Sequence, residues 1–422
     1  MIMNKPKMKR VVSYILPVLF LALFALSTQA KDRYRIVPGA ESTEEYFPLL
    51  KGKKIAVVAN HTAILGHDHL VDSLKNSGFK IKCVFAPEHG FRGESGNGDK
   101  VSGGKDPKTG IPIISLYGKH LKPTAKDLEG VKIVIFDIQD VGVRFYTYIS
   151  TLQYVMEACA ELDIQLIVLD RPNPNGFYVD GPVLKKEFQS FVGMQPVPVV
   201  YGMTIGEYAM MLNGEGWLNK KVKCNLKVVS LINYDHNTKA VIRIPPSPNL
   251  PDMDAIYLYP GICLLEGAHV SLGRGTSKPF RLIGYPGYES KEGEKDTTFI
   301  PKEIKGVASN PPFEDTLCKG IDLTGKGIMV RINPGLDLSV LIKMYQNYPE
   351  KEKFFNNFFN KLAGNSELQE QIRNNVGTEE IRASWKKDLD AFKLIRKKYL
   401  LYPDFTTLEK MKGEERKVKS EK

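Results

Sequence analysis

The 422-residue sequence is poor in cysteine: it has five, and no two of them lie close together. Metal knuckles and disulfide-stapled scaffolds need closely spaced cysteines, so the sequence excludes both classes. Several of the five lie inside apolar runs, and we therefore expect buried thiols with at most one or two disulfide bridges. The five are Cys83, Cys159, Cys224, Cys263 and Cys318.

The sequence also lacks the common catalytic and cofactor motifs. It has no G-x-S-x-G nucleophile elbow and no H-E-x-x-H zinc motif. The glycine-rich stretch GESGNG (93–98) has neither the spacing of a dinucleotide fingerprint nor the Lys-Ser/Thr ending of a phosphate loop. We therefore predict that the protein binds no nucleotide and no other cofactor.

A metal site has only weak support in the sequence. His61, His67, His69 and His89, together with Asp68, could hold zinc, but their spacing follows no standard ligand pattern. We predict no metal site.

Long apolar runs are absent except at the beginning of the chain. Four basic residues precede a 16-residue apolar stretch from Val11 to Leu26, and Ser-Thr-Gln-Ala follows at 27–30. This pattern predicts a cleaved secretory signal at residues 1–30. An uncleaved membrane anchor is the alternative, although the run is shorter than the roughly 20 residues that span a bilayer. We expect an exported protein, periplasmic or extracellular, that does not contact the membrane after cleavage.

The net charge is positive but modest. The formal charge is +11, and removal of the four basic residues in the signal leaves +7. This surplus suits an anionic partner such as a cell-wall polymer, and it is also compatible with ordinary solubility. Export argues against a nucleic-acid partner.

Short apolar runs alternate with amphipathic segments from Lys53 onward, which predicts an α/β fold with a Rossmann-like, mostly parallel sheet flanked by helices. The runs are apolar on both faces, as covered strands must be. They are KIAVVAN (54–60), IKCVFAP (81–87), IPIISLYG (111–118), VKIVIFD (131–137) and IQLIVLD (164–170). A proline-rich change of texture after residue 243 predicts a Rossmann-like domain at 31–243, a smaller α/β domain at 244–408 and a solvated tail at 409–422.

Helix signals are clear at three places. Residues 148–162 carry an apolar stripe, and a long amphipathic helix is predicted over 381–399. Thr204 and Glu207 form a capping box, so we interpret Glu207 as structural and not catalytic. The charged stretch from Glu289 to Lys305 is predicted to be a surface loop.

Polar residues follow each predicted strand, and the carboxyl ends of parallel strands meet at one edge where ligands bind. Glu88 ends its strand among glycines, and it is either a proton donor or an acid that orders its own loop. The other strand-tip candidates for substrate contact are Asn60, His61, His89, Arg92, Gln139, Asp140, Arg171 and Asn173.

Two further clusters add candidates. Arg144 and Tyr146 follow a strand and resemble part of a sugar or carboxylate grip, although Asp140 could instead cap a turn and the tyrosines could be core residues. In the second domain, Glu266 precedes a glycine-rich stretch in which Arg274 resembles an anion clamp. Glu266 is thus the natural second carboxylate, and Asp140 is its competitor.

Taken together and in order, these motifs resemble the family of exo-β-N-acetylmuramidases called NamZ. The motifs run from about residue 35 to 400 and are VANHTAIL, FAPEHGFRG, ISLYG, FDIQDVGVRFYTYISTL, DRPNPNG, YGMTIGEYA, PSPNLP, YLYPGICLLEGAHVSLGRGTSKPF and INPGLDLSVLI. The resemblance implies two domains with the site between them. It implies removal of terminal β-1,4-linked N-acetylmuramic acid from non-reducing ends of peptidoglycan fragments, with Glu88 as the catalytic acid.

The candidates take roles in this chemistry. A glycosidase needs an acid and a second group, which can be a base, a nucleophile or the acetamido group of the substrate. Muramic acid carries a lactyl carboxylate, so selectivity calls for a cation, and Arg92, Arg144, Arg171 and Arg274 are candidates. Two other functions stay open at this point: a non-catalytic protein that binds cell-wall fragments, and a metal-dependent amidase.

Overall fold

A computed structural model describes residues 35–93, 104–289 and 296–405. We call 35–243 the amino-terminal part and 244–405 the carboxy-terminal part. The predicted signal and tail lie outside the described residues. Within the described residues, no helix is both long and apolar enough to cross a membrane.

The amino-terminal part is built on a seven-stranded sheet with the order β5-β6-β4-β1-β7-β8-β9. All neighbours pair in parallel except the edge strand β5, which runs antiparallel to β6. The parallel strands, numbered along the chain, have the order 3-2-1-4-5-6 of a Rossmann fold. The strands are β1 (Lys54–Ala59), β4 (Lys80–Ala86), β5 (Gly104–Lys105), β6 (Pro112–Ser115), β7 (Ile133–Asp137), β8 (Gln165–Leu169) and β9 (Leu226–Val229).

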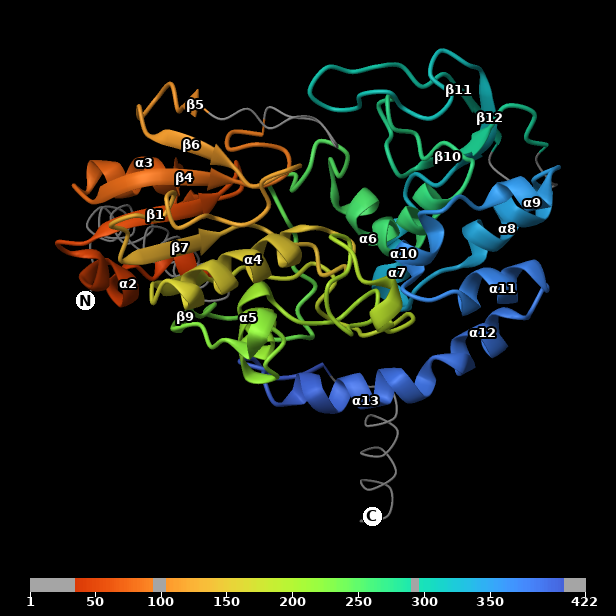
Figure 1. The fold of residues 1–422 in the computed structure, drawn as a ribbon. Coiled ribbons are helices and arrows are strands. Elements are labelled where there is room, and N and C mark those ends of the chain that lie inside the picture. Colours follow the sequence, from red (N-terminus) through yellow and green to blue (C-terminus); the bar gives the residue numbers. More distant parts are fainter. Residues whose placement is uncertain (1–34, 94–103, 290–295, 406–422) are drawn as a thin grey trace, which may run out of the picture.

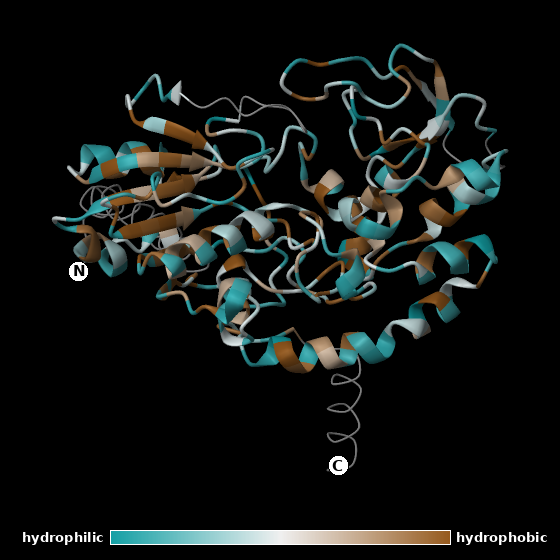
Figure 2. Ribbon diagram, viewed as in Figure 1, coloured by the Kyte–Doolittle hydropathy of each residue, from teal (hydrophilic) through white to brown (hydrophobic). Residues whose placement is uncertain are grey.

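Helices cover both faces of this sheet, which explains why its central strands are mostly apolar (Figures 1 and 2). Alternate side chains point to opposite faces. Ile55 and Val57 of β1 face α2 and α3, whereas Ala56 and Val58 belong to the core that contains α4 and α5. The helices are α2 (Thr43–Leu50), α3 (Leu70–Asn76), α4 (Tyr148–Glu161) and α5 (Ile205–Gly214), and a short hairpin is formed by β2 (Ile64–Leu65) and β3 (Asp68–His69).

The carboxy-terminal part combines a small antiparallel sheet, of order β10-β12-β11, with a series of short helices. Its core is continuous with that of the α4 face of the large sheet. The elements are α6 (Met253–Ile262), β10 (Leu282–Tyr285), β11 (Asp296–Phe299), β12 (Cys318–Asp322), α7 (Gly327–Ile332), α8 (Ser339–Asn347), α9 (Lys351–Phe354), α10 (Phe359–Ala363), α11 (Glu367–Arg373), α12 (Thr378–Ser384) and α13 (Lys386–Lys397). The described residues also contain four 3-10 helices: η1 (Gly39–Glu41), η2 (Lys186–Phe188), η3 (Asn219–Lys221) and η4 (Cys263–Gly267).

This architecture confirms the predicted fold: a Rossmann-like, mostly parallel sheet followed by a smaller α/β part. The capping box is present, with the Thr204 amide donating to Oε2 of Glu207 at 2.9 Å. Glu207 is fully buried there, so its structural interpretation is confirmed. The boundary at residue 243 stays a prediction.

Two local predictions were wrong. The long helix predicted over 381–399 is broken at Trp385 into α12 and α13. The Ser384 hydroxyl donates to the Ile381 carbonyl at 2.7 Å, and the Trp385 side chain is buried in the core at the break. Part of the predicted surface loop at 289–305 forms β11, because Asp296–Phe299 pairs with β12. The strand that pairs with β11, β12, lies further along the chain, so the pattern of residues within 289–305 does not indicate the pairing.

Arg144 connects the two parts of the chain from within the core. Its side chain is fully buried, and Nη1 donates to the carbonyls of Pro182 and Val197 at 2.7 and 2.8 Å. Nη2 donates to the carbonyls of Leu362 and Ala363, both at 2.8 Å, in α10. The prediction that Arg144 contacts substrate was therefore wrong, because all four bonds of its two terminal nitrogens go to buried backbone.

Replacing Arg144 by Met removes a hydrogen-bond donor from each of four buried carbonyls, of which only that of Val197 has another donor among the described residues, the Leu184 amide. We expect the free energy of unfolding to fall by about 3 kcal/mol or more, measured by denaturant titration. Arg243→Met is the matched control, because Arg243 is exposed, and its effect should stay within about 0.5 kcal/mol. An Arg144→Met protein as stable as the control would contradict this role.

Candidate active site

A cavity of about 230 Å³ lies between the two parts of the chain, beyond the carboxyl ends of β4 and β6. We call it the inner cavity. Glu88 and Thr147 line it from the amino-terminal part, and Tyr259, Glu266 and Arg274 line it from the carboxy-terminal part. The structure thus brings both predicted catalytic carboxylates to one cavity.

Glu88 is positioned by the turn that follows β4. His89 has φ of 70° and Gly90 has φ of 78°, so two successive residues adopt the left-handed conformation. This conformation favours glycine, and its adoption by His89 stores strain of a kind that clusters at functional sites. The Glu88 side chain is 8% exposed, and its Oε2 accepts a hydrogen bond from the Thr147 hydroxyl at 2.9 Å.

Glu266 lies in η4 and forms an ion pair with Arg274. The Arg274 guanidinium also lies over the ring of Phe280, with its Cζ 4.9 Å from the centroid. Burial opposes the positive charge of Arg274, but the adjacent Glu266 carboxylate outweighs it and the pKa of the guanidinium is raised. The pair is therefore a carboxylate and a charged arginine, side by side at the wall of the inner cavity.

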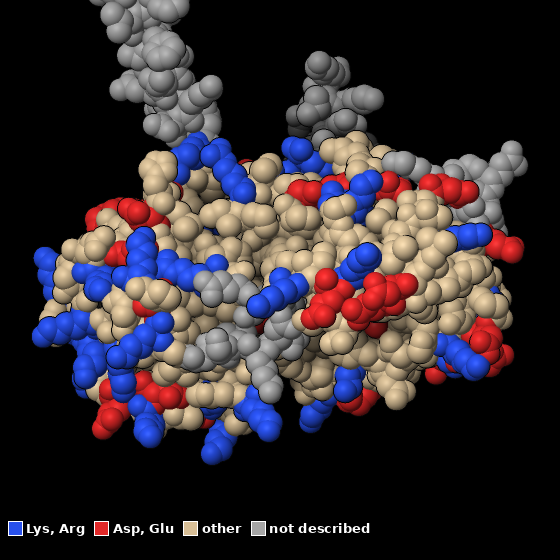
Figure 3. Space-filling view, turned by 90° about the horizontal axis from the view of Figure 1, so that it is seen from above, with Lys and Arg blue, Asp and Glu red and all other residues tan. Residues whose placement is uncertain are grey.

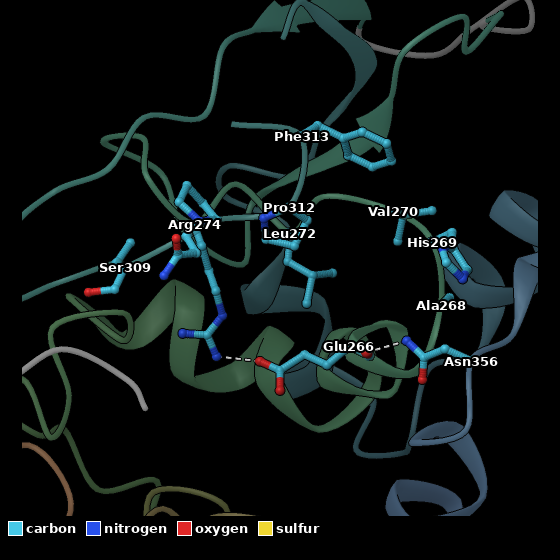
Figure 4. A pocket seen from close by; sticks show the side chains of 13 residues that line it. Glu266, Ala268, His269, Val270, Leu272, Arg274, Ser309, Pro312, Phe313 and Asn356 are labelled. Atoms are coloured by element: carbon cyan, nitrogen blue, oxygen red, sulfur yellow. Dashed lines mark hydrogen bonds and ion pairs between the residues drawn. The ribbon is translucent and has the colours of Figure 1, made fainter. Parts of the chain in front are cut away.

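A second cavity of about 480 Å³ adjoins the first, and we call it the outer cavity (Figure 4). It is formed entirely by the carboxy-terminal part. Glu266 and Arg274 line both cavities, so their ion pair lies where the two meet. The Asn356 amide donates to the Glu266 carbonyl at 3.2 Å and supports the backbone at this junction.

The segment that links the two parts crosses the carboxyl edge of the large sheet. Nε2 of His61 donates to the Pro245 carbonyl at 2.7 Å, and the Tyr146 hydroxyl donates to the Pro246 carbonyl at 2.8 Å. Burial lowers the pKa of His61, which favours the neutral ring. Ile244 lines a separate cavity of about 760 Å³, whereas Ser247 lines the inner cavity. The link therefore divides the sheet edge into two compartments.

The structure sorts the predicted site residues into these compartments. The inner cavity has five of them: Glu88, His89, Tyr146, Glu266 and Arg274. The separate cavity at the other compartment has two, Gln139 and Arg171. The remaining six line no cavity described here and are engaged elsewhere: Asn60, His61, Arg92, Asp140, Arg144 and Asn173.

Among these, the interpretation of Asp140 as a possible second carboxylate was wrong. It is buried, and its Oδ2 accepts hydrogen bonds from the Tyr201 hydroxyl and, at 2.7 Å, from the Gly142 amide. Burial raises the pKa of Asp140 to about 6. Because it lies beneath the site and caps a turn, Asp140 does not compete with Glu266 for the position of second carboxylate.

Two asparagines also serve the scaffold. Nδ2 of Asn173 donates to the Met203 carbonyl at 2.8 Å, and its side chain lies so close to Gly142 that a Cβ there would clash. Asn60 is fully buried and donates to the Tyr148 hydroxyl at 2.9 Å. Both predictions of direct substrate contact were wrong for the same reason. The side-chain amides of these two residues are buried and donate hydrogen bonds to a backbone carbonyl or to a tyrosine hydroxyl.

The other arginines are held by carboxylates. Arg92 pairs with Asp72 and Asp106 at 2.9 and 2.8 Å. Arg171 binds Asp137 through two nitrogens, with Nη2 to Oδ2 at 2.8 Å. Of the four arginines proposed to read a substrate carboxylate, only Arg274 lines the inner cavity.

The sequence interpretation missed several cavity residues. Thr147, Tyr259 and Phe280 all line the inner cavity, as do Ser247 and Asn249 of the linking segment. Each lies inside one of the motifs that resemble the NamZ family, but nothing in the sequence separates these single polar or aromatic residues from their neighbours as cavity residues. Only the packing of the two parts reveals that these segments converge.

The described residues contain no group of three or more His, Cys, Asp and Glu side chains suited to a metal. His69, one of the four histidines considered, directs Nε2 to the Asn60 carbonyl at 2.9 Å. All five cysteines are buried and unpaired, in agreement with the expectation of buried thiols.

A Rossmann-like part joined to a smaller α/β part, with two carboxylates in the cavity between them, defines a class of protein: an α/β enzyme with a site of the glycoside hydrolase type. Comparison with known families is consistent with this. Residues 55–254 match the amino-terminal model of the exo-β-N-acetylmuramidase NamZ, and residues 257–402 match its carboxy-terminal model. The chain belongs to the NamZ family.

Individual relatives agree with this assignment. The chain is 41% identical over 374 residues to the peptidoglycan β-N-acetylmuramidase NamZ of Bacillus subtilis (strain 168), covering 85% of this chain and 89% of that one. Two solved structures of DUF1343 family proteins from Bacteroides fragilis are also similar. One has a TM-score of 0.80 at 45% identity and the other 0.72 at 29%, and they cover 88% of this chain and 99% and 100% of their own. The predicted resemblance and enzyme class are confirmed.

Proposed function

We propose that this protein is an exo-acting β-N-acetylmuramidase that removes terminal N-acetylmuramic acid from the non-reducing ends of peptidoglycan fragments. The observation that carries the proposal is the convergence of Glu88 and Glu266 on one cavity between the two parts of a NamZ-family chain. The activity for which the relative from Bacillus subtilis is named supports it.

Glu88 is the proposed general acid. Its Oε2 is fixed by the Thr147 hydroxyl, and among the described residues its Oε1 accepts no hydrogen bond. That free oxygen can carry the proton that the departing glycosidic oxygen needs. Because the side chain is nearly buried and held by a neighbour, the proton is presented in a defined direction.

Glu266 is the proposed second carboxylate. It forms an ion pair with Arg274, which holds its side chain at the wall of the inner cavity, where it can assist at the anomeric carbon. It can do so as a base for water, as a nucleophile, or by orienting the acetamido group of the substrate.

Arg274 is the proposed reader of the lactyl carboxylate that distinguishes muramic acid from glucosamine. A guanidinium can bind two carboxylates at once through separate nitrogens. Arg274 is thus able to hold Glu266 and the substrate together at the cavity wall.

Glu88→Gln removes the proton and keeps the shape of the side chain. We expect kcat on a muramic-acid-terminated disaccharide to fall at least about 100-fold, with disaccharide binding kept within a few fold. Released monosaccharide and calorimetric binding measure the two quantities. The exposed Glu129→Gln is the control and should leave both unchanged. Full turnover by Glu88→Gln would remove Glu88 from the mechanism.

Arg274→Met tests selectivity. We expect the ratio of kcat/KM for muramic-acid-terminated over glucosamine-terminated disaccharide to fall about tenfold or more, since a charged hydrogen bond contributes about 1.5–3 kcal/mol. The ratio cancels any general loss of activity. Arg92→Met is the matched control, because Arg92 lines neither cavity of the site. A ratio that changes in the control alone would assign the carboxylate to the other arginine.

The cellular location is proposed from residues 1–30 alone. The basic residues, apolar run and small residues there support export to the periplasm or the exterior and release from the membrane. The surface is compatible with an anionic cell-wall partner, since Lys and Arg side chains are spread over the face in Figure 3 and are denser over the amino-terminal part. Amino-terminal sequencing of the protein from the cell envelope should begin at Lys31, and a sequence beginning at Met1 would instead support an anchor.

A further inference from the structure

The inner and outer cavities are neighbours that share the Glu266–Arg274 pair in their walls, and they differ in size and in lining. The inner cavity has about 230 Å³ and the outer about 480 Å³. The inner cavity therefore has about half the volume of the outer one. Because Glu88 and Glu266 both line the inner cavity, we take it to hold the terminal sugar.

The two cavities also differ in their walls. The inner cavity is lined by buried aromatic side chains, among them Phe145, Tyr259 and Phe280, and it opens to solvent at half-buried residues such as Tyr117 and Phe191. The outer cavity reaches the surface, because His269, Asn310 and Pro312 at its wall are exposed. The outer cavity is thus a larger space beside the inner one that can take a further part of a glycan.

We propose that the outer cavity is the subsite for the sugar that leaves, the N-acetylglucosamine residue linked to the terminal muramic acid. This inference rests on the proposed function and adds where the rest of the substrate lies. The wall offers an apolar surface in Phe313 and Leu272, and polar groups in Ser309 and His269 (Figure 4). Such a mixture fits a pyranose, which has apolar ring faces and polar edges.

The subsite explains exo action in terms of shape. The terminal sugar enters a small cavity with aromatic walls, and everything attached to its reducing side lies in a larger, open one. A muramic acid residue from the middle of a chain carries a sugar on both sides, and in this proposal only the sugar on its reducing side has a cavity.

Two substrates separate the subsite from the chemistry. A muramic-acid-terminated disaccharide needs space for its second sugar. The β-fluoride of N-acetylmuramic acid has no second sugar and does not need that space. Ser309→Trp places an indole in the outer cavity, and Phe313→Ala removes part of its apolar wall. We expect each variant to lower kcat/KM for the disaccharide at least about tenfold. We expect kcat/KM for the fluoride to change less than about twofold.

Ser77→Trp is the control for the added indole, because Ser77 is exposed at the end of α3 and far from both cavities in sequence and fold. Melting temperatures show whether each variant is folded. Equal losses on both substrates by a folded Ser309→Trp protein would overturn the assignment, because the outer cavity would then hold the terminal sugar. Unchanged kinetics on both would overturn it as well. A wild-type protein that hydrolyses neither substrate would refute the proposed function, and the subsite with it.

Discussion

One buried cation binds both parts of the chain at the interface that forms the site. Arg144 lies at the start of the turn before α4, and its two terminal nitrogens bind carbonyls on both sides of the interface. Burial lowers the pKa of this guanidinium to about 9, so it still carries its charge at neutral pH. Four carbonyl dipoles compensate that charge, and they do so only if α10 lies against the amino-terminal part. Glu88 and Glu266 come from opposite sides of this interface, so the packing of the two parts is what brings the two carboxylates to one cavity.

The linking segment has the same kind of role at the sheet edge. A Rossmann sheet offers a broad crevice beyond its carboxyl ends, and nucleotide-binding relatives of the fold use it for a long ligand. Here the carbonyls of Pro245 and Pro246 accept hydrogen bonds from His61 and Tyr146, and the segment is held across the crevice. The remaining compartment above β4 and β6 is short and is completed by the carboxy-terminal part. The same sheet thereby serves a compact sugar-sized site.

The sequence predicted the large sheet because its strands are covered on both sides, which makes them apolar runs that stand out from their surroundings. It predicted the convergence of Glu88 and its neighbours at one edge because parallel strands impose it. It could not separate Arg144 from Tyr146, two residues apart in one motif, although one is enclosed by backbone carbonyls and the other lines the cavity. The same limit applies to Asp140 and Asn173. Their residue types fit substrate recognition equally well, and only the packed structure shows that buried hydroxyl and backbone groups already occupy them. β11 and the break at Trp385 were missed because a distant strand and the core decide them.

The last described residues of the carboxy-terminal part return to the amino-terminal part. The Tyr402 hydroxyl donates to Asp170 at 2.6 Å, the Leu401 amide to Glu207 at 2.9 Å, and Nε of Arg396 to the Gly202 carbonyl at 2.8 Å. The carboxy-terminal part is thus joined to the amino-terminal part at both of its ends, by the linking segment and by these three hydrogen bonds. A rotation that moves the far end of the carboxy-terminal part away from the large sheet would have to break these bonds.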